Sequence, residues 1–386
     1  MIKRFSNYLL LFLFLGLTNI LCAQEEYKTF VVDSLSFTSD DYRHEVTSVA
    51  EPRPHKRPKN VILMIGDGMG LTHIFAGMVA NGGNLYLKNI SNIGFITTHS
   101  HNRFVTDSGA GGTALACGVK TYNGAIGVDK DTLAAENIRE KAEKKGRATG
   151  VVSTSAVTHA TPASFVAHQP SRNRYEAIAS DFLKSNIDLF IGGGMDHFNK
   201  RKDSVDFVLS LKEKGYTVLT SIDAIEKTEA KKMAGFTSSG HNPGMLEGRG
   251  NILPRATQSA IRLLNRNKKG FFLMVEGSQI DWGSHENFTA YLTTEVLDFD
   301  QAIGEVLKFA ARDGETLVVV TADHETGGFS VENGSYEKGD VYGDFTSDDH
   351  TGTLVPVYAF GPGSEYFRGF HDNTDIPKII ARLAGW

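Results

Sequence analysis

The chain has 386 residues, with 40 lysines and arginines against 45 aspartates and glutamates and a formal net charge of −5. The acidic balance, with no basic cluster beyond residues 54–59, argues against nucleic acid as a partner. Hydrophobic residues make up 41% of the sequence, which is ordinary for a soluble globular protein. The length allows one large α/β domain.

The N-terminus has the layout of a cleavable secretory signal. Lys3 and Arg4 precede an apolar run over residues 8–20, and small residues follow at the predicted cleavage site after Ala23. The run is too short to be a permanent membrane span. We therefore expect a signal peptide over residues 1–23 and an exported, periplasmic protein.

Two other destinations stay open. One is a lipid anchor on Cys22, although Leu21 is bulkier than the residue that usually precedes a lipid-attachment cysteine. The other is secretion. Once the signal is removed, Cys117 is the only cysteine, so the mature chain has no internal disulfide.

The organisation after the signal is simple. Residues 24–58 are polar, rich in proline near their end and without periodicity, so we interpret them as an N-terminal arm or linker. A single domain is predicted over residues 59–386, with a short inserted surface loop at 329–349, where Gly, Asp and Ser are frequent.

Buried strands alternate with amphipathic helices along this domain. The continuous apolar run at 61–65 is typical of a strand buried on both faces. Similar runs lie at 149–153, 189–191, 271–275, 316–321 and 355–360. Helical patterns lie at 134–145, 175–184, 203–214, 254–267, 290–312 and 375–384. This alternation predicts an α/β fold, a three-layer α/β/α sandwich around a largely parallel central sheet.

Polar side chains that can bind metals follow several of the predicted strands. Asp67 follows the first strand, Glu276 the strand at 271–275, and Asp323 with His324 the strand at 316–321. In parallel sheets, ligands bind beyond the carboxyl ends of the strands. Each residue alone also fits an ordinary turn, because Asp and Gly often close strands.

A second group suggests which metals these are. Asp281 and His285 stand four residues apart on a predicted helix and share one face, where His350 is a further candidate ligand. Solvated helix contacts and an exposed loop histidine are the alternatives. Mixed carboxylate and imidazole ligands suit zinc, and two adjacent sites suit a phosphoryl group. Oxygen ligands such as Asp67, Glu276 and a threonine hydroxyl suit magnesium.

The segment 106–114 contains a candidate nucleophile. Ser108 lies among small residues at the start of a predicted helix, where free N–H groups attract an anion. The alternative is that Asp107 or Ser108 is only a helix cap. A serine–histidine–aspartate triad is conceivable as the activator of the serine, but no G-x-S-x-G elbow is present, and metal coordination is the alternative activator.

Taken together, these motifs resemble the alkaline phosphatase family from about Asn60 to the C-terminus. The resemblance rests on Asn60–Gly70, Asp107-Ser108, 118–124, His159–Ala163, Arg172, 274–277, 280–281 with His285, 321–328 and His350–Gly352. It implies hydrolysis of small-molecule phosphate monoesters to an alcohol and inorganic phosphate, through a phosphoserine on Ser108.

The resemblance also implies two zinc ions and one magnesium ion. One zinc site would comprise Asp281, His285 and His350, the other Asp67, Asp323 and His324, and the magnesium site Asp67, Thr161 and Glu276. Arg172 would bind two non-bridging phosphate oxygens with its planar fork. Members of the family are commonly homodimers, so a homodimer is an alternative to a single chain.

Two positions differ from the best-known bacterial members. This chain has His159 where they carry an aspartate and Trp282 where they carry a lysine. Both residues, with Asp107, are expected near the substrate or the third metal. The third site then has two alternative occupants, magnesium or zinc.

Three rival functions differ from this one in particular residues. A phosphodiesterase of the same superfamily is disfavoured, because Arg172 would bind a dianionic monoester more strongly than a diester. A sulfatase is excluded because Ser108 is followed by Gly-Ala-Gly, without the proline and arginine of C/S-x-P-x-R. A non-catalytic metal- or phosphate-binding protein has no use for a nucleophile.

Overall fold

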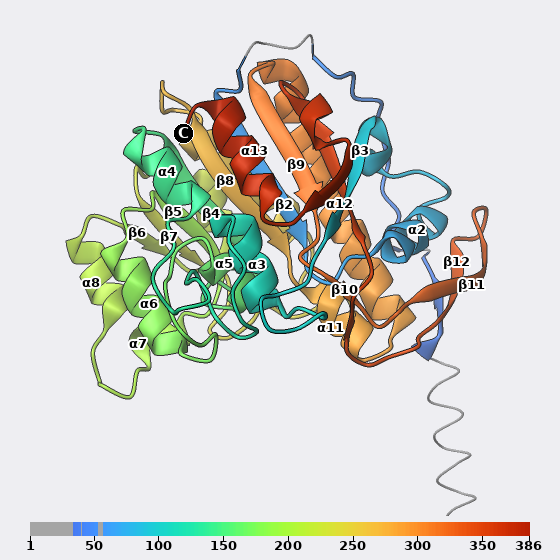
Figure 1. Cartoon of the computed structure of the whole chain (residues 1–386), viewed down its shortest axis with the longest axis horizontal. Helices are drawn as coiled ribbons and strands as arrows, with labels where there is room; N and C mark the ends of the chain where they lie inside the picture. Colours follow the sequence, from blue (N-terminus) through green and yellow to red (C-terminus); the bar gives the residue numbers. More distant parts are fainter. Residues whose placement is uncertain (1–33, 40, 53–56) are drawn as a thin grey trace, which may run out of the picture.

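The computed structural model describes residues 34–39, 41–52 and 57–386, so the predicted signal peptide lies outside the described residues. A ten-stranded sheet forms the centre of the molecule (Figure 1). In order across the sheet, the strands are β15 (Gly369–Asp372), β3 (Asn92–Thr97), β14 (Val355–Phe360), β9 (Thr316–Thr321), β2 (Asn60–Gly66), β8 (Phe271–Gly277), β4 (Ala148–Ala156), β5 (Leu189–Gly193), β7 (Met233–Phe236) and β6 (Thr217–Leu219). Within this sheet β14 runs antiparallel to both neighbours, and the remaining pairs are parallel.

Helices surround this sheet. The longer ones are α2 (Leu71–Ala80), α3 (Ser108–Cys117), α6 (Tyr175–Lys184), α10 (Ile252–Leu264), α12 (Thr289–Asp313) and α13 (Asp375–Ala384). The shorter ones are α4 (Ile138–Lys144), α5 (Ala160–Ala163), α7 (Asp196–Asn199), α8 (Phe207–Glu213), α9 (Ile222–Lys227) and α11 (Gln279–His285), with 3-10 turns η1 (Tyr86–Asn89), η2 (Met245–Glu247) and η3 (Ser364–Phe367). Helices α10 and α12 pack together against the sheet, and α4 and α13 also pack together against it.

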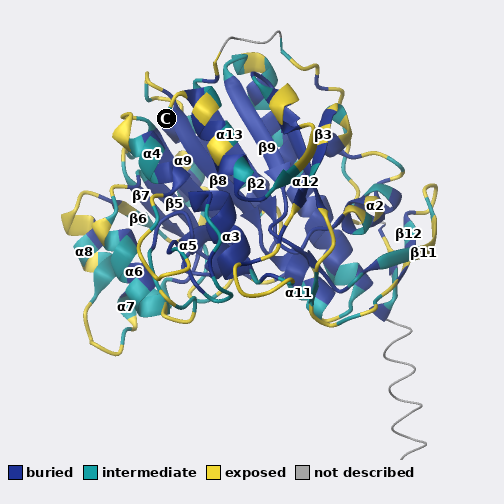
Figure 2. Cartoon of the chain, viewed as in Figure 1, coloured by how far each residue is buried: buried dark blue, intermediate teal, exposed yellow. Residues whose placement is uncertain are grey.

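The central strands are buried along their whole length, as Figure 2 shows. Every residue of β2, β8 and β9 is buried, because helices cover a parallel sheet on both faces and leave no solvated side. The predicted α/β fold with a largely parallel central sheet is confirmed.

Among the described residues, none of the helices combines the length and the apolar character needed to cross a membrane.

The segment 329–349, for which we expected an inserted surface loop, contains two antiparallel strands, β11 (Ser330–Ser335) and β12 (Asp340–Asp344). The strand β1 (Ser36–Thr38) from the N-terminal arm adds to β12, so a three-stranded sheet forms beside α2 and α12. The exposed strand β11, with the sequence SVENGS, has little apolar alternation, and the pairing of β1 with β12 joins segments far apart in sequence, which is why the sequence pattern indicated a loop.

The register of the sheet brings the predicted ligands to one edge. Ile65 of β2 pairs with Glu276 of β8 on one side and with Thr321 of β9 on the other. Asp67 and Asp323 both follow these positions by two residues, so the carboxyl ends of three adjacent strands carry acidic side chains side by side.

Candidate active site

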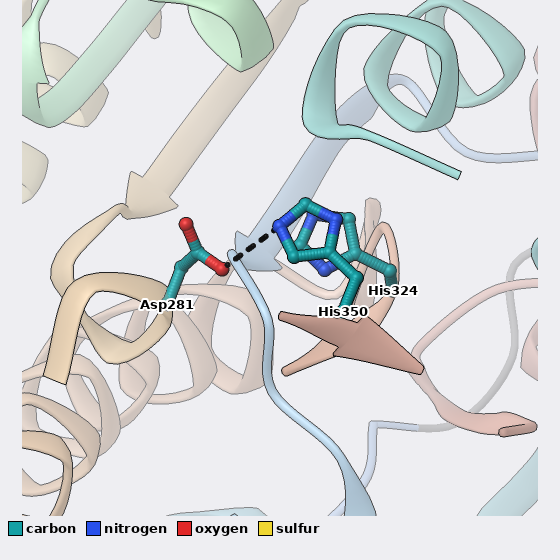
Figure 3. Close-up of side chains that lie close together, drawn as sticks. All are labelled: Asp281, His324 and His350. Atoms are coloured by element: carbon teal, nitrogen blue, oxygen red, sulfur yellow. Dashed lines mark ion pairs between the residues drawn. The ribbon is translucent and has the colours of Figure 1, made fainter. Parts of the chain in front are cut away.

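The first cluster of predicted ligands joins α11 to a small two-stranded sheet. Asp281 and His285 lie on α11, and His350 lies on β13 (His350–Thr351), which pairs with β10 (Glu325–Thr326). The Oδ1 atom of Asp281 lies 3.4 Å from Nε2 of His285 and 3.4 Å from Nε2 of His350. Figure 3 shows Asp281 facing His350, with His324 behind it.

Both imidazoles of this cluster are fixed through their Nδ1 atoms. His285 Nδ1 lies 2.7 Å from the carbonyl oxygen of Asp348, and His350 Nδ1 lies 2.8 Å from that of Thr106. A ring that donates its Nδ1–H to a carbonyl presents a bare Nε2, and the two Nε2 atoms lie 3.1 Å apart. Two lone pairs and a carboxylate oxygen at this spacing fit a cation between them.

The second cluster is entirely buried. His324 Nε2 lies 3.3 Å from Oδ1 of Asp67 and 3.4 Å from Oδ2 of Asp323. Those two carboxylate oxygens have no hydrogen-bond partner in the described part of the chain. Buried polar atoms without a partner are costly, so this cluster also fits a cation. The rings of His324 and His350 stack with centroids 3.6 Å apart, so the two clusters are adjacent.

The third cluster offers mainly oxygen. Asp67, His159 and Glu276 have potential ligand atoms within 4.8 Å of one another, and Thr161 Oγ1 donates to Asp67 Oδ2 at 3.4 Å. One oxygen of Glu276 accepts from the hydroxyls of Ser153, Ser155 and Ser278, whereas its buried Oε1 has no partner among the described residues. This oxygen-rich set matches the preference of magnesium, and His159 supplies a nitrogen that zinc accepts.

The electrostatics of these clusters favour bound cations. Burial, followed by the charge of Asp323, raises the pKa of Asp67 well above its usual value. Burial also lowers the pKa of His324, so this ring stays neutral.

Ser108 begins helix α3 beside the second cluster. Its Oγ lies 3.3 Å from Nε2 of His324, and the serine is almost completely buried. Asp107 caps the helix by accepting from Ala110 N at 3.0 Å, so both sequence interpretations of this segment, cap and nucleophile position, are compatible. A Cβ on Gly111 would lie 3.0 Å from the carbonyl oxygen of Asp323, so a residue without a side chain is needed for this close approach.

Arg172 is held next to this serine. Its Nη1 donates to Oδ2 of Asp107 at 2.9 Å, and its Nη2 lies 3.2 Å from Nε2 of His159. Burial, and then the positive charge of Arg172, lower the pKa of His159 to about 3, so His159 is neutral. A neutral imidazole adds no charge that would compete with the guanidinium for an anion.

Two further aromatic rings pack around His159, the ring that contacts the guanidinium. Trp282 and His159 meet edge to face with centroids 5.8 Å apart, and His241 meets Trp282 at 4.8 Å and His159 at 5.5 Å. His241 Nδ1 accepts a hydrogen bond from Ala156 N at 3.1 Å, so its proton is on Nε2. Trp282 therefore lies beside His159, which contacts Arg172.

All predicted site residues come together at the carboxyl ends of β2, β8, β9 and β4. Several residues around them gave no signal in the sequence, because serine, threonine and single histidines are common in loops and strands. They are Ser153 and Ser278 on Glu276, Thr326 on Asp281 and His324, His241 beside Trp282, and Asp349 beside His285 and His350.

Comparison with known proteins agrees with this geometry. A family model described as alkaline phosphatase matches residues 58–343 and 332–386. The chain belongs to the alkaline phosphatase family. Alkaline phosphatase 4 of Bacillus subtilis (strain 168) is 37% identical over 409 residues, which cover 84% of this chain and 88% of the relative. The alkaline phosphatase of Escherichia coli (strain K12) is 32% identical and covers 83% of this chain and 85% of its own length.

Solved structures give the same family. The alkaline phosphatase of the Antarctic bacterium TAB5 is 45% identical, with a TM-score of 0.81, over 86% of this chain and 99% of that chain. Members of this alkaline phosphatase family are phosphoric monoester hydrolases, so this chain is an enzyme of that class.

Proposed function

We propose that this alkaline phosphatase hydrolyses phosphate monoesters through a phosphoserine on Ser108, in a centre built for two zinc ions and one magnesium ion. The observation that supports this most is the position of Ser108 Oγ, 3.3 Å from Nε2 of His324. This nitrogen faces two carboxylate oxygens that have no hydrogen-bond partner among the described residues. Ser108 is therefore placed to act as a nucleophile, and the cap of helix α3 is supplied by Asp107 instead.

The protein's own groups have separate tasks in this reaction. Arg172 binds the non-bridging phosphoryl oxygens, and Asp107 fixes its fork through one ion pair at 2.9 Å. The N-terminus of α3 presents its positive end to the anion at Ser108. Phosphoryl transfer depends mainly on alignment and charge neutralisation, which these groups supply.

The proposed ligand sets follow the three clusters. Asp281, His285 and His350 would hold the first zinc, and Asp67, Asp323 and His324 the second. Bound divalent cations lower the pKa of a coordinated hydroxyl or water and neutralise phosphoryl charge.

The third site would bind magnesium through Asp67, Thr161 and Glu276. His159 beside it leaves zinc as the alternative occupant. A histidine-to-glutamate variant of the TAB5 alkaline phosphatase is described with Mg bound in its M3 site.

We also infer that the chain is exported to the periplasm after cleavage of residues 1–23, with 24–58 as an arm before the domain at 59–386. A lipid anchor or secretion are the alternatives, and dimerisation stays a prediction from the family. A comparison of the full-length chain with a chain that starts at Gln24, by cell fractionation and N-terminal sequencing, tests this. Retention of the full-length chain in the cytoplasm contradicts it.

The catalytic proposal is tested with purified protein that is chelated and then reloaded with zinc and magnesium. We expect an aryl phosphate monoester to be hydrolysed at alkaline pH far faster than the matching diester, and only after metals are restored. A preference for the diester would make the protein a phosphodiesterase. If the reloaded protein shows no turnover of either ester, the protein would be a non-catalytic binding protein.

A further inference from the structure

Thr326 lies between side chains that belong to different clusters. It stands on β10, two residues after His324, and pairs with His350 across the two-stranded sheet. Its Oγ1 lies 2.6 Å from Oδ1 of Asp281 and 3.2 Å from Nδ1 of His324. A hydroxyl has one proton and two lone pairs, so it can donate to the carboxylate while it accepts from the imidazole.

This arrangement sets the tautomer of His324. If Nδ1–H of His324 donates to Thr326, then Nε2 is bare and faces Asp67 and Asp323. His285 and His350 obtain the same tautomer from main-chain carbonyls, which a substitution cannot remove. Among the three ligand histidines, His324 is thus the one whose Nδ1 partner is a side chain.

The hydroxyl also holds Asp281. It donates to Oδ1, the same oxygen that lies 3.4 Å from Nε2 of both His285 and His350. An accepted hydrogen bond fixes the direction in which this oxygen presents its remaining lone pairs.

The surroundings of the hydroxyl are built for this contact. Thr326 and His324 are completely buried and Asp281 is 4% exposed, so water has little access to replace a missing hydrogen bond. A Cβ on Gly68 would lie 2.7 Å from Thr326 Oγ1, so the glycine after Asp67 leaves room for the threonine. The Thr326 amide also donates to the carbonyl oxygen of Gly68 at 3.1 Å.

We propose that Thr326 is a positioning residue that fixes His324 and Asp281 through one hydroxyl and thereby couples the two zinc sites. This inference rests on the proposed metal centre. Loss of the hydroxyl leaves the Nδ1–H of His324 and one acceptor position of Asp281 without a partner. Both zinc sites are then expected to weaken together, by about 10- to 100-fold in affinity, as for other groups that orient metal ligands.

The test uses three variants of the mature protein. Thr326→Val keeps the shape and removes the hydroxyl, and Thr326→Ser keeps the hydroxyl. Thr294→Val is the matched control, because Thr294 is buried on α12 and its hydroxyl bonds only main-chain oxygens of Ala290 and Tyr291. Circular dichroism and thermal unfolding of the chelated proteins establish that each variant folds. If Thr326→Val does not fold, Thr326→Ala takes its place.

Two measurements report on the metal sites without reference to turnover. Competition with a chromophoric chelator gives the Zn²⁺ affinity of each site, and the visible absorption of the Co²⁺-loaded protein reports ligand geometry. We expect Thr326→Val to weaken both Zn²⁺ sites and change the Co²⁺ spectrum, while Thr326→Ser and Thr294→Val stay close to the parent protein.

Two results would overturn the inference. One is a valine variant with the parent's Zn²⁺ affinities and Co²⁺ spectrum, and the other is a serine variant that loses as much affinity as the valine variant. Failure of the parent protein to bind two Zn²⁺ ions is a different result, since it contradicts the proposed centre itself and the inference with it.

Discussion

At the scale of single residues, each of three buried carboxylates in the site has one oxygen that is free to bind a ligand. Asp67 Oδ1, Asp323 Oδ2 and Glu276 Oε1 are buried without a hydrogen bond among the described residues, while the other oxygen of Glu276 accepts from serine hydroxyls. Burial of such atoms is unfavourable unless something binds them. The residues beside them, Ser108 and Arg172, are those that we propose as nucleophile and phosphoryl-binding cation.

Arg172→Lys tests the anion clamp. A lysine carries the charge but lacks the planar fork, so it cannot bond Asp107 and two phosphoryl oxygens in one plane. Loss of a charged hydrogen bond costs about 1.5–3 kcal/mol, which lowers kcat/KM for a monoester by about 10- to 100-fold. Inhibition by inorganic phosphate should weaken by a similar factor. Steady-state kinetics measure both.

Arg174→Lys serves as the control for this change, because Arg174 is exposed at the start of α6. Unchanged inhibition by phosphate in Arg172→Lys would exclude Arg172 from the anion site.

At the scale of elements, caps decide where helices begin. We expected a helix at 134–145, but α4 starts at Ile138 because Asn137 and Glu140 form a capping box. Likewise α8 starts at Phe207 instead of 203, because the side chain of Asp206 accepts from Val208 N and Leu209 N. Periodicity indicates the existence of a helix, and the hydrogen bonds of its first turn determine its boundary.

Glu140→Gln tests a charge pair at the start of α4. Glu140 Oε1 lies 3.0 Å from Nε2 of His168, and this hydrogen bond raises the pKa of His168. Burial raises the pKa of Glu140, but the hydrogen bond with His168 lowers it, and the overall shift is downward. The raised His168 pKa stabilises the fold below about pH 6.5, and the lowered Glu140 pKa stabilises it above about pH 4.5.

The pair therefore contributes most between these two limits and is lost as pH rises through the pKa of folded His168. Glutamine keeps the capping box and removes the charge. We expect a loss of about 1 kcal/mol near about pH 6 and a smaller loss near about pH 9, measured by urea unfolding. The control Glu136→Gln removes a surface pair with Lys144 and should show no such pH dependence. Equal losses for Glu140→Gln at both pH values would contradict the pair.

Arg249→Met tests a buried cluster that attaches the segment around η2 to α12. Arg249 Nη2 contacts Oε2 of Glu295 at 2.5 Å and Oδ2 of Asp298 at 2.7 Å, all almost completely buried. Even with this partner, burial raises the pKa of Asp298 to about 6. Removal of the cation leaves two uncompensated carboxyl groups and should cost about 3–5 kcal/mol in unfolding free energy.

Adding Glu295→Gln and Asp298→Asn to Arg249→Met should restore part of this loss. A single variant that unfolds within about 1 kcal/mol of the parent would show that the cluster contributes little.

At the scale of the whole molecule, much of the fold was predictable from local patterns. The apolar run at 61–65 predicted β2, and the stripe at 290–312 predicted α12, because burial on a sheet or against a core requires a regular spacing of apolar residues. The N-terminal arm and the segment 329–349 gave no such signal, since their strands β1, β11 and β12 depend on one another.

The site shows the same division. The carboxylates and histidines that end strands were identifiable as candidate ligands because of their chemistry and their position after apolar runs. Thr326 and His241 were not, because their importance depends on which neighbours the fold brings to them. The roles assigned to all of these residues stay predictions until they are tested.

We expect the buried carboxylates to make stability depend on metal. Asp67, Glu276, Asp281 and Asp323 lie together with little or no exposure. Burial, and then the neighbouring charges, raise the pKa of Asp67 and Asp323, so the chelated folded protein holds more protons than the unfolded chain. Below about pH 6.5 the lowered pKa values of the buried His159 and His324 act in the opposite direction, so stability of the chelated protein should fall as pH rises above about 6.5.

Bound cations compensate the carboxylate charges and stabilise the folded state by mass action. The difference in Tm between metal-loaded and chelated protein should therefore be larger near about pH 8 than near about pH 6. Calorimetry at both pH values, with restoration by zinc and magnesium as the control, measures this. A difference that narrows as pH rises would contradict the clustered carboxylates as the cause.

The covalent intermediate on Ser108 is the central claim, and trapping it is the most direct test. Metal-reloaded protein is mixed with a radiolabelled aryl phosphate monoester, quenched with acid during turnover, digested and analysed by mass spectrometry. We predict one phosphoryl group on Ser108 in the parent protein and none in Ser108→Ala, which should keep its metals but lose turnover. Turnover by the parent with no label on Ser108, or turnover retained by Ser108→Ala, would contradict the account.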